Sequence, residues 1–163
     1  MLKLTEKFFP AFIKAHPPGY IAVVLVDNSQ GHSCYAENAL RASKMNFRPG
    51  GAQPWMRDGW YIKNGQKVVQ EMNFPADHSQ YPNQPKGMKI VLTERGLWRN
   101  GLPMKCKGGC KDSATDCCAT CIPQHQPDFS AQRSRVQEII EAEGKYSILF
   151  CCILLLILMI YLL

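Results

Sequence analysis

The stretch Ile21-Ala22-Val23-Val24-Leu25-Val26-Asp27-Asn28-Ser29-Gln30-Gly31-His32 places a carboxylate directly after an unbroken apolar run. Six apolar residues, four of them β-branched, predict a strand that is buried on both faces. In α/β proteins, ligands and metal ions bind beyond the carboxyl ends of such strands. We therefore expect an α/β fold with Asp27 at a binding site, although a turn aspartate before a helix would give the same local pattern.

The overall composition sets broad limits on the class of protein. A length of 163 residues fits one domain with a small subdomain or a tail. The formal net charge of +6 fits contact with nucleic acid or acidic lipid and equally fits simple solubility. The N-terminal segment lacks the apolar region and the small-residue cleavage site of a signal peptide. The eight cysteines are therefore not expected to form the disulfide framework of a secreted protein.

Hydrophobic periodicity and turn residues predict the other elements. The expected elements are a helix from Leu4 to Ile13 that is kinked at Pro10, a helix from Ser33 to Met45, a hairpin that turns at Asn64-Gly65, a short helix from Met88 to Glu94, a helix that Asp128 caps and Gly144 ends, and a strand from Tyr146 to Phe150.

Further short motifs follow the first stretch in a fixed order. The Asp-Asn-Ser pattern alone is weak, but the ordered series resembles the DDE-superfamily endonuclease domain of mariner-like transposases, from the start of the chain to Phe150. The motifs are Val26 to His32, Ala39-Leu40-Arg41-Ala42-Ser43-Lys44-Met45-Asn46, Met56-Arg57-Asp58-Gly59-Trp60, Lys86-Gly87-Met88-Lys89, Glu94-Arg95-Gly96-Leu97-Trp98, Asp116-Cys117-Cys118 and Gln126-Pro127-Asp128-Phe129.

The resemblance implies an RNase H-like fold, in which helices lie on both sides of a mixed sheet. It also implies DNA as the partner, the nucleus as the location, and three acids that bind two Mg²⁺ or Mn²⁺ ions for strand cleavage. Asp27 matches the second acid. The first belongs to a hairpin region that would precede Met1. The third follows the last strand, where this chain reads Phe150-Cys151-Cys152-Ile153-Leu154.

The resemblance therefore implies a fragment of a transposase-like endonuclease, truncated at both ends, that does not cut DNA by itself. The expected fold is an incomplete RNase H-like mixed sheet with a Cys-rich insertion and an apolar C-terminal helix or strand. Residues 1–45 form the core segment with Asp27, residues 46–127 an irregular insertion, residues 128–145 a core helix, and residues 146–163 an apolar tail. No motif for a small-molecule substrate is evident.

Five cysteines lie close together within the insertion. Zinc takes four nitrogen or sulfur ligands in a tetrahedron, and cysteines separated by short loops commonly supply them. A structural Zn²⁺ would keep a segment with few core residues ordered, but the irregular spacing also fits free or redox-labile thiols. The best ligands are Cys106, Cys110, Cys117 and either Cys118 or Cys121, with His125 as a weaker candidate.

Tryptophans and basic residues alternate in the insertion. This mixture fits stacking on bases together with contact to phosphates. It also fits a small hydrophobic core within the insertion, which is the interpretation that we favour. The residues are Trp55, Trp60 and Trp98 with Arg57, Lys63, Arg95 and Arg99.

The segment from Tyr146 to Leu163 contains no charged residue. As a helix it would extend about 27 Å at about 1.5 Å per residue, close to the roughly 30 Å hydrocarbon core of a bilayer. One hypothesis is therefore a single-pass, tail-anchored membrane protein with a zinc-binding soluble body. The other is a buried strand up to Phe150, followed by sequence unrelated to the family because the reading frame is lost there. A core helix fits least well.

Overall fold

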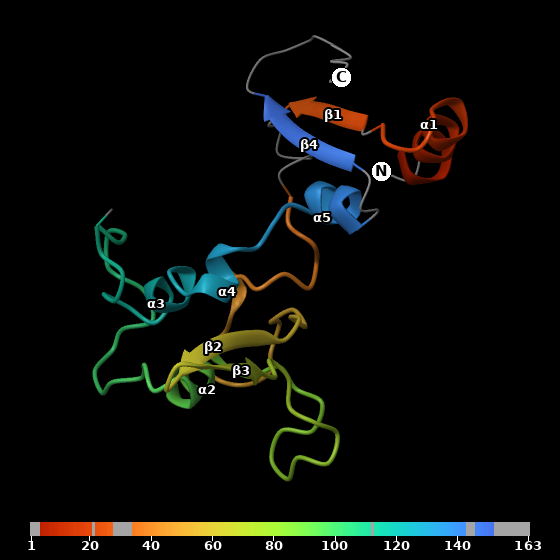
Figure 1. Ribbon diagram of the computed structural model, residues 1–163. Helices are drawn as coiled ribbons and strands as arrows, with labels where there is room; N and C mark the ends of the chain where they lie inside the picture. Colours follow the sequence, from red (N-terminus) through yellow and green to blue (C-terminus); the bar gives the residue numbers. More distant parts are fainter. Residues whose placement is uncertain (1–3, 21, 28–33, 112, 143–145, 152–163) are drawn as a thin grey trace. The chain divides into compact units, whose positions relative to one another are not determined.

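The computed structural model describes residues 4–20, 22–27, 34–111, 113–142 and 146–151 (Figure 1). The described elements are a mixture of helices and strands, which confirms the α/β class. They belong to two compact units. Unit 1 combines Met1–Ala36 with Arg133–Leu163, and unit 2 is the continuous stretch from Glu37 to Gln132. Unit 2 is therefore an insertion in the chain of unit 1, and its ends differ from the segment ends at residues 45 and 127 that the sequence suggests.

Unit 1 contains two parallel strands, β1 (Ala22–Asp27) and β4 (Tyr146–Cys151). Their register runs from Ala22 opposite Tyr146 to Asp27 opposite Cys151. Both predicted strands are thus confirmed, and Asp27 lies at the carboxyl end of β1. Parallel strands need a crossover connection, and helix α5 (Arg135–Ala142) leads the chain from unit 2 into β4.

The packing of unit 1 is limited. Helix α1 (Phe9–Ala15) follows a π-helical turn at Leu4–Phe8. Pro10 lies in the first turn of α1, next to the point where the π-helical turn changes to an α-helix. The predicted burial of β1 on both faces is wrong at Val23, which is 43% exposed. The buried cluster consists of Phe9, Ala22, Val136 and Ile140.

Helix α5 begins later than the sequence predicts. The Ser134 Oγ accepts a hydrogen bond from the Gln137 backbone N–H at 3.2 Å, as an N-cap residue does. Asp128 is not a cap but lies in the first turn of a separate short helix, α4 (Pro127–Ser130). After α4 the Gln132 side chain donates to the Asp128 carbonyl at 2.8 Å and accepts the Leu40 N–H at 3.1 Å. The local bond to Asp128 and the long-range bond to Leu40 accompany the break between α4 and α5, where the sequence predicts one continuous helix. Gly144 lies outside the described residues.

Unit 2 contains the predicted hairpin and the predicted short helix. Strands β2 (Gly59–Lys63) and β3 (Gln66–Gln70) pair antiparallel around Asn64 and Gly65. These two turn residues have φ of 52° and 76°, as a type I′ turn requires. Helix α2 (Met88–Glu94) ends at Gly96, which has φ 72° and lets the Leu97 N–H reach the Leu92 carbonyl at 2.8 Å.

The predicted helix from Ser33 to Met45 is wrong. Only Ala42–Lys44 forms a short 3-10 turn among the described residues of this segment. The Leu40 N–H binds the Gln132 side chain, and the Asn38 carbonyl accepts the Arg57 N–H at 2.8 Å. Because these backbone groups bond to distant segments, they are not available to a helical ladder. Leu40 is still buried, so its apolar character reflects burial in an irregular segment.

The hydrophobic core of unit 2 gathers methionines and aliphatic side chains from most of its length. Helix α3 (Cys121–Gln124) adds Ile122 to it, and α4 adds Phe129. The full cluster is Leu40, Ala42, Met45, Met56, Met72, Met88, Val91, Leu92, Leu102, Ala119, Ile122 and Phe129.

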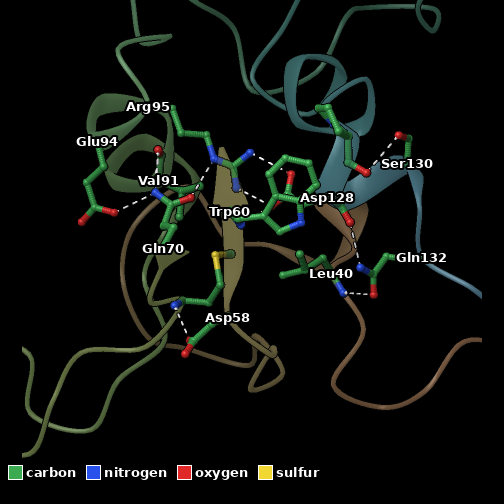
Figure 2. A network of polar contacts seen from close by, with 12 residues as sticks. Leu40, Asp58, Trp60, Gln70, Val91, Glu94, Arg95, Asp128, Ser130 and Gln132 are labelled. Atoms are coloured by element: carbon green, nitrogen blue, oxygen red, sulfur yellow. Dashed lines mark hydrogen bonds and ion pairs between the residues drawn. The ribbon is translucent and has the colours of Figure 1, made fainter. Parts of the chain in front are cut away.

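A buried ion pair crosses unit 2 (Figure 2). The Arg95 guanidinium donates to both carboxylate oxygens of Asp128, at 2.9 and 2.6 Å, and neither side chain is more than 1% exposed. Asp128 also accepts the Trp60 N–H at 2.9 Å, and the Arg95 Nε donates to Gln70 at 2.7 Å. A Cβ on Gly59 would lie 2.5 Å from the Asp128 carboxylate, so glycine is needed there. The network joins α2, α4 and both hairpin strands.

The apolar tail is described only in its first part. Tyr146–Cys151 forms strand β4, which agrees with the strand interpretation of this segment. Residues 152–163, on which the membrane-anchor hypothesis mainly depends, lie outside the described residues. Among the described helices, none has both the length and the hydropathy that crossing a bilayer requires.

Replacing Arg95 by Met, or Asp128 by Ala, is expected to lower the free energy of unfolding of unit 2 by about 3–5 kcal/mol, because each leaves one buried charge without its partner. Urea denaturation followed by tryptophan fluorescence measures this, since Trp55, Trp60 and Trp98 all belong to unit 2. The control is Arg99→Ala, which breaks an exposed pair with Asp116 and should cost about 1 kcal/mol or less. An equal loss of unfolding free energy on breaking either pair would contradict the conclusion that the Arg95–Asp128 pair is buried and the Arg99–Asp116 pair exposed.

Candidate metal centre

Two short segments of unit 2 lie side by side and bring distant cysteines together. The Ala119 N–H donates to the Pro103 carbonyl at 2.9 Å, and the Thr120 N–H donates to the Met104 carbonyl at 3.1 Å. The Thr120 hydroxyl donates to the same Met104 carbonyl at 2.8 Å. Cys106 comes shortly after Pro103 and Met104, and Cys117 and Cys118 come directly before Ala119 and Thr120. The pairing of these two segments therefore brings the three cysteines close together.

A glycine turn returns the chain to the same place. Gly108 and Gly109 have φ of 79° and 92°, in the left-handed region that glycine adopts without strain. The Gly109 N–H lies 3.4 Å from the Cys106 carbonyl, which closes the turn. The turn leads directly to Cys110. Beyond it, Arg99 binds the Asp116 carboxylate at 3.1 Å in an exposed ion pair on the far side of the loop.

Four sulfur atoms converge at this point. The Sγ atoms of Cys106, Cys110, Cys117 and Cys118 all lie within 4.8 Å of one another. A zinc ion with Zn–S bonds of about 2.3 Å places tetrahedral sulfurs about 3.8 Å apart, so a small contraction would suffice. The four thiols can therefore hold a metal ion such as Zn²⁺. Among the residues that the structure describes, no other set of three or more potential metal ligands lies this close together.

The structure distinguishes the two alternatives for the fourth ligand. Cys118 belongs to the group, whereas Cys121 directs its thiol to the Ala114 carbonyl at 2.9 Å. The Cys121 N–H instead donates a hydrogen bond to the Cys118 sulfur at 3.4 Å, which helps to hold that sulfur in its position in the group. The weaker candidate, His125, lies with its Nδ1 3.7 Å from the Cys121 sulfur and outside the group.

The thiols of the group influence one another electrostatically. Hydrogen bonding to Cys117 and desolvation raise the pKa of Cys106 from 9.0 to about 11. Hydrogen bonds to Cys117 and Cys118 raise the pKa of Cys110 as well. Burial opposes ionisation of Cys118, but hydrogen bonds from the Cys121 N–H and the Cys110 thiol outweigh it, and its pKa is lowered. Without a metal, the Cys106 and Cys110 thiols are therefore protonated at neutral pH.

The predicted Mg²⁺ or Mn²⁺ site at Asp27 belongs to unit 1. Asp27 ends β1 opposite Cys151, which is where the sequence places it. The Asp27 side chain and the segments that follow both strands, residues 28–33 and 152–163, lie outside the described residues. The role of Asp27 as a catalytic metal ligand thus stays a prediction.

The tryptophans of the insertion have different environments. Trp98 packs against the core and contacts Phe47 with ring centroids 5.6 Å apart, as the core interpretation requires. Trp60 is half-buried beneath the Lys67 ammonium, 4.3 Å from its ring centroid. Trp55 is 56% exposed and is not a core residue. Arg95 and Arg99 are both engaged by carboxylates, so the predicted basic surface is smaller than the sequence suggests.

The sequence did not predict that Arg95 and Asp128 would bind each other. Both residues occur in the motifs quoted above, but neither their spacing nor their surroundings identifies a buried pair. The available signals were local: Gly59, which leaves room for a carboxylate, and Pro127, which begins α4 and fixes the position of Asp128.

Comparisons of the chain with known protein families, curated proteins and solved structures find no significant match.

Titration with Co²⁺ or Zn²⁺ is expected to give one bound ion per chain, with the absorption of a tetrahedral thiolate site for Co²⁺. Cys110→Ser and Cys118→Ser should each weaken binding by more than about 100-fold, since even outer-shell changes cost about 10- to 100-fold. Cys110 is exposed, so its substitution leaves the core intact.

The matched control is Cys121→Ser, which removes a neighbouring thiol outside the group and keeps a hydroxyl donor for the Ala114 carbonyl. This variant should bind the metal as the unchanged chain does. Loss of binding in Cys121→Ser, with binding retained in Cys118→Ser, would reverse the ligand assignment.

Metal affinity is expected to rise with pH between 6 and 8. The raised pKa values of Cys106 and Cys110 mean that protons must leave these thiols when the ion binds. Lower pH therefore favours the protonated, metal-free form. Calorimetric titration in buffers of different ionisation enthalpy measures the protons released per ion. Proton-independent binding would show that the ligands are not these thiols.

Proposed function

We propose that this chain is part of an RNase H-like endonuclease domain of the DDE type, with DNA as its partner. Asp27 would supply the second of three metal-binding acids, and the chain alone would not cut DNA. The observation that carries the proposal is the position of Asp27 at the carboxyl end of β1, paired in parallel with β4. Strand ends of this kind are where α/β sheets bind ligands and metal ions.

The chain order around β1 and β4 supports the proposal. In the family that the sequence resembles, the strand with the second acid is followed later by a helix and a last strand. Here β1 is followed by unit 2, then by α5 and β4. Among the described residues, β1 and β4 form a two-stranded parallel sheet in which Val23 is exposed, and a larger RNase H-like sheet would continue from these two strands.

The inserted unit has a second role in this proposal. We infer that Cys106, Cys110, Cys117 and Cys118 hold a structural Zn²⁺, because four thiolates leave no open position for a substrate. The ion would replace hydrophobic contacts in the loop between Met104 and Ala119, where few apolar side chains are buried. The zinc site supports the insertion and takes no part in cleavage.

The chain is expected to bind duplex DNA with an affinity that falls as salt rises, and to produce no nicked plasmid with Mg²⁺ or Mn²⁺. Binding follows from the net charge of +6, and inactivity follows because the resemblance assigns only Asp27, of the residues in this chain, to the three metal-binding acids. Fluorescence anisotropy at several salt concentrations measures binding, and gel analysis of supercoiled plasmid measures nicking.

Two charge-matched variants make this experiment specific. Asp27→Asn changes the proposed metal ligand, and Asp77→Asn changes an exposed acid of unit 2 by the same charge. Nicking that Asp27→Asn abolishes and Asp77→Asn preserves would refute the proposed inactivity. Absence of DNA binding at low salt would refute DNA as the partner.

A further inference from the structure

Two thiols of the four-cysteine group are placed for reaction with each other. The Cys110 and Cys118 sulfurs lie 3.7 Å apart. A disulfide bond is about 2.05 Å long, so the two sulfurs must move closer by the difference between these two distances. Cys110 follows Gly108 and Gly109, and a Cβ added at either glycine would meet nothing within 4 Å. No other segment therefore packs against these two glycines, whose backbones adjust more readily than those of other residues.

The two thiols differ in their access to solvent. Cys110 is exposed, whereas Cys118 is 1% exposed. A small oxidant would reach Cys110 first. The raised pKa of the free Cys110 thiol slows its oxidation in the metal-free protein, whereas a bound metal ion keeps its sulfur deprotonated and reactive. Cys118 would then lie within reach of the oxidised sulfur. An exposed thiol next to a sheltered second thiol is the arrangement in which a sulfenic acid is converted to a disulfide.

We propose that Cys110 and Cys118 form a peroxide-sensitive pair whose oxidation to a disulfide releases the metal ion. Hydrogen peroxide oxidises the Cys110 sulfur to a sulfenic acid as its oxygen–oxygen bond breaks, and the first water leaves. The Cys118 sulfur then attacks the Cys110 sulfur, the sulfur–oxygen bond breaks, and the second water leaves. The pair loses two electrons, and the thiols, or solvent when the metal is bound, supply two protons.

The disulfide would remove half of the ligand set. Cys106 and Cys117 alone cannot complete the four-coordinate site that zinc needs, so the ion dissociates. Release of the ion rests on the zinc site of the proposed function, whereas disulfide formation rests on the thiol geometry alone. A thiol reductant reverses the reaction by exchange and restores the site.

Cys121 is less well placed than Cys118 as the partner of Cys110, although its thiol also interacts with Cys110. Its thiol donates to the Ala114 carbonyl at 2.9 Å, and its sulfur lies outside the converging group. Cys121 is therefore the matched control for Cys118, since the two residues lie three positions apart and both are buried.

Peptide mapping tests the pair directly in the full chain. The reduced, metal-free protein is treated with hydrogen peroxide, and remaining thiols are alkylated before digestion. Trypsin cleaves after Lys105, Lys107 and Lys111, so Cys106 and Cys110 appear on separate peptides. Cys117, Cys118 and Cys121 share one peptide, and fragmentation assigns the linked residue. The expected product is a Cys110–Cys118 cross-link that Cys118→Ser abolishes and Cys121→Ser leaves unchanged.

A second measurement follows the metal. The zinc-loaded protein is treated with peroxide in the presence of a chromogenic zinc chelator, and the thiols lost are counted. We expect one zinc ion released for every two thiols lost, with recovery of binding after reduction. A cross-link from Cys110 to Cys117 or Cys121 in equal yield, or oxidation without any cross-link, would overturn the inference. A protein that binds no zinc yet forms the Cys110–Cys118 bond would refute the zinc site and leave the thiol pair standing.

Discussion

The buried pair of Arg95 and Asp128 is the interaction on which unit 2 depends. It connects α2 to α4 and, through Gln70 and the Trp60 N–H, to both strands of the hairpin. Two charges removed from water are stable only when each has its partner and its remaining hydrogen bonds. This requirement fixes the positions of three separate segments at once, and it also requires a glycine at position 59.

The metal centre concerns the stability of a different part of unit 2, the loop that contains Cys110. The loop that contains Cys110 buries few apolar side chains, so hydrophobic burial alone stabilises no single conformation of this loop strongly. Backbone pairing at Pro103 and Ala119 brings the loop ends together, and four thiols meet just beyond that point. A bound ion would supply the missing stabilisation, but it would also make the loop sensitive to oxidation of its ligands.

Local sequence signals predicted the elements whose hydrogen bonds are local. The hairpin turns at Asn64 and Gly65 because both adopt positive φ, and α2 ends at Gly96 for the same reason. The predicted helix over residues 33–45 was wrong, and the helix predicted to begin at Asp128 begins only at Arg135. In both segments the Gln132 side chain binds a backbone group, the Leu40 N–H in the first and the Asp128 carbonyl in the second. Apolar periodicity identified buried residues in those segments but could not show that distant polar groups compete for the backbone.

The sequence by itself determined the α/β class, the apolar strand that ends at Asp27, and the set of five cysteines in the insertion. These features depend on residue type and on neighbours in the chain. The tertiary structure alone decided that Cys118 and not Cys121 joins the group, and that Asp128 binds Arg95 and does not cap a helix. Both outcomes depend on contacts between residues far apart in the chain, whose free energies no local pattern contains.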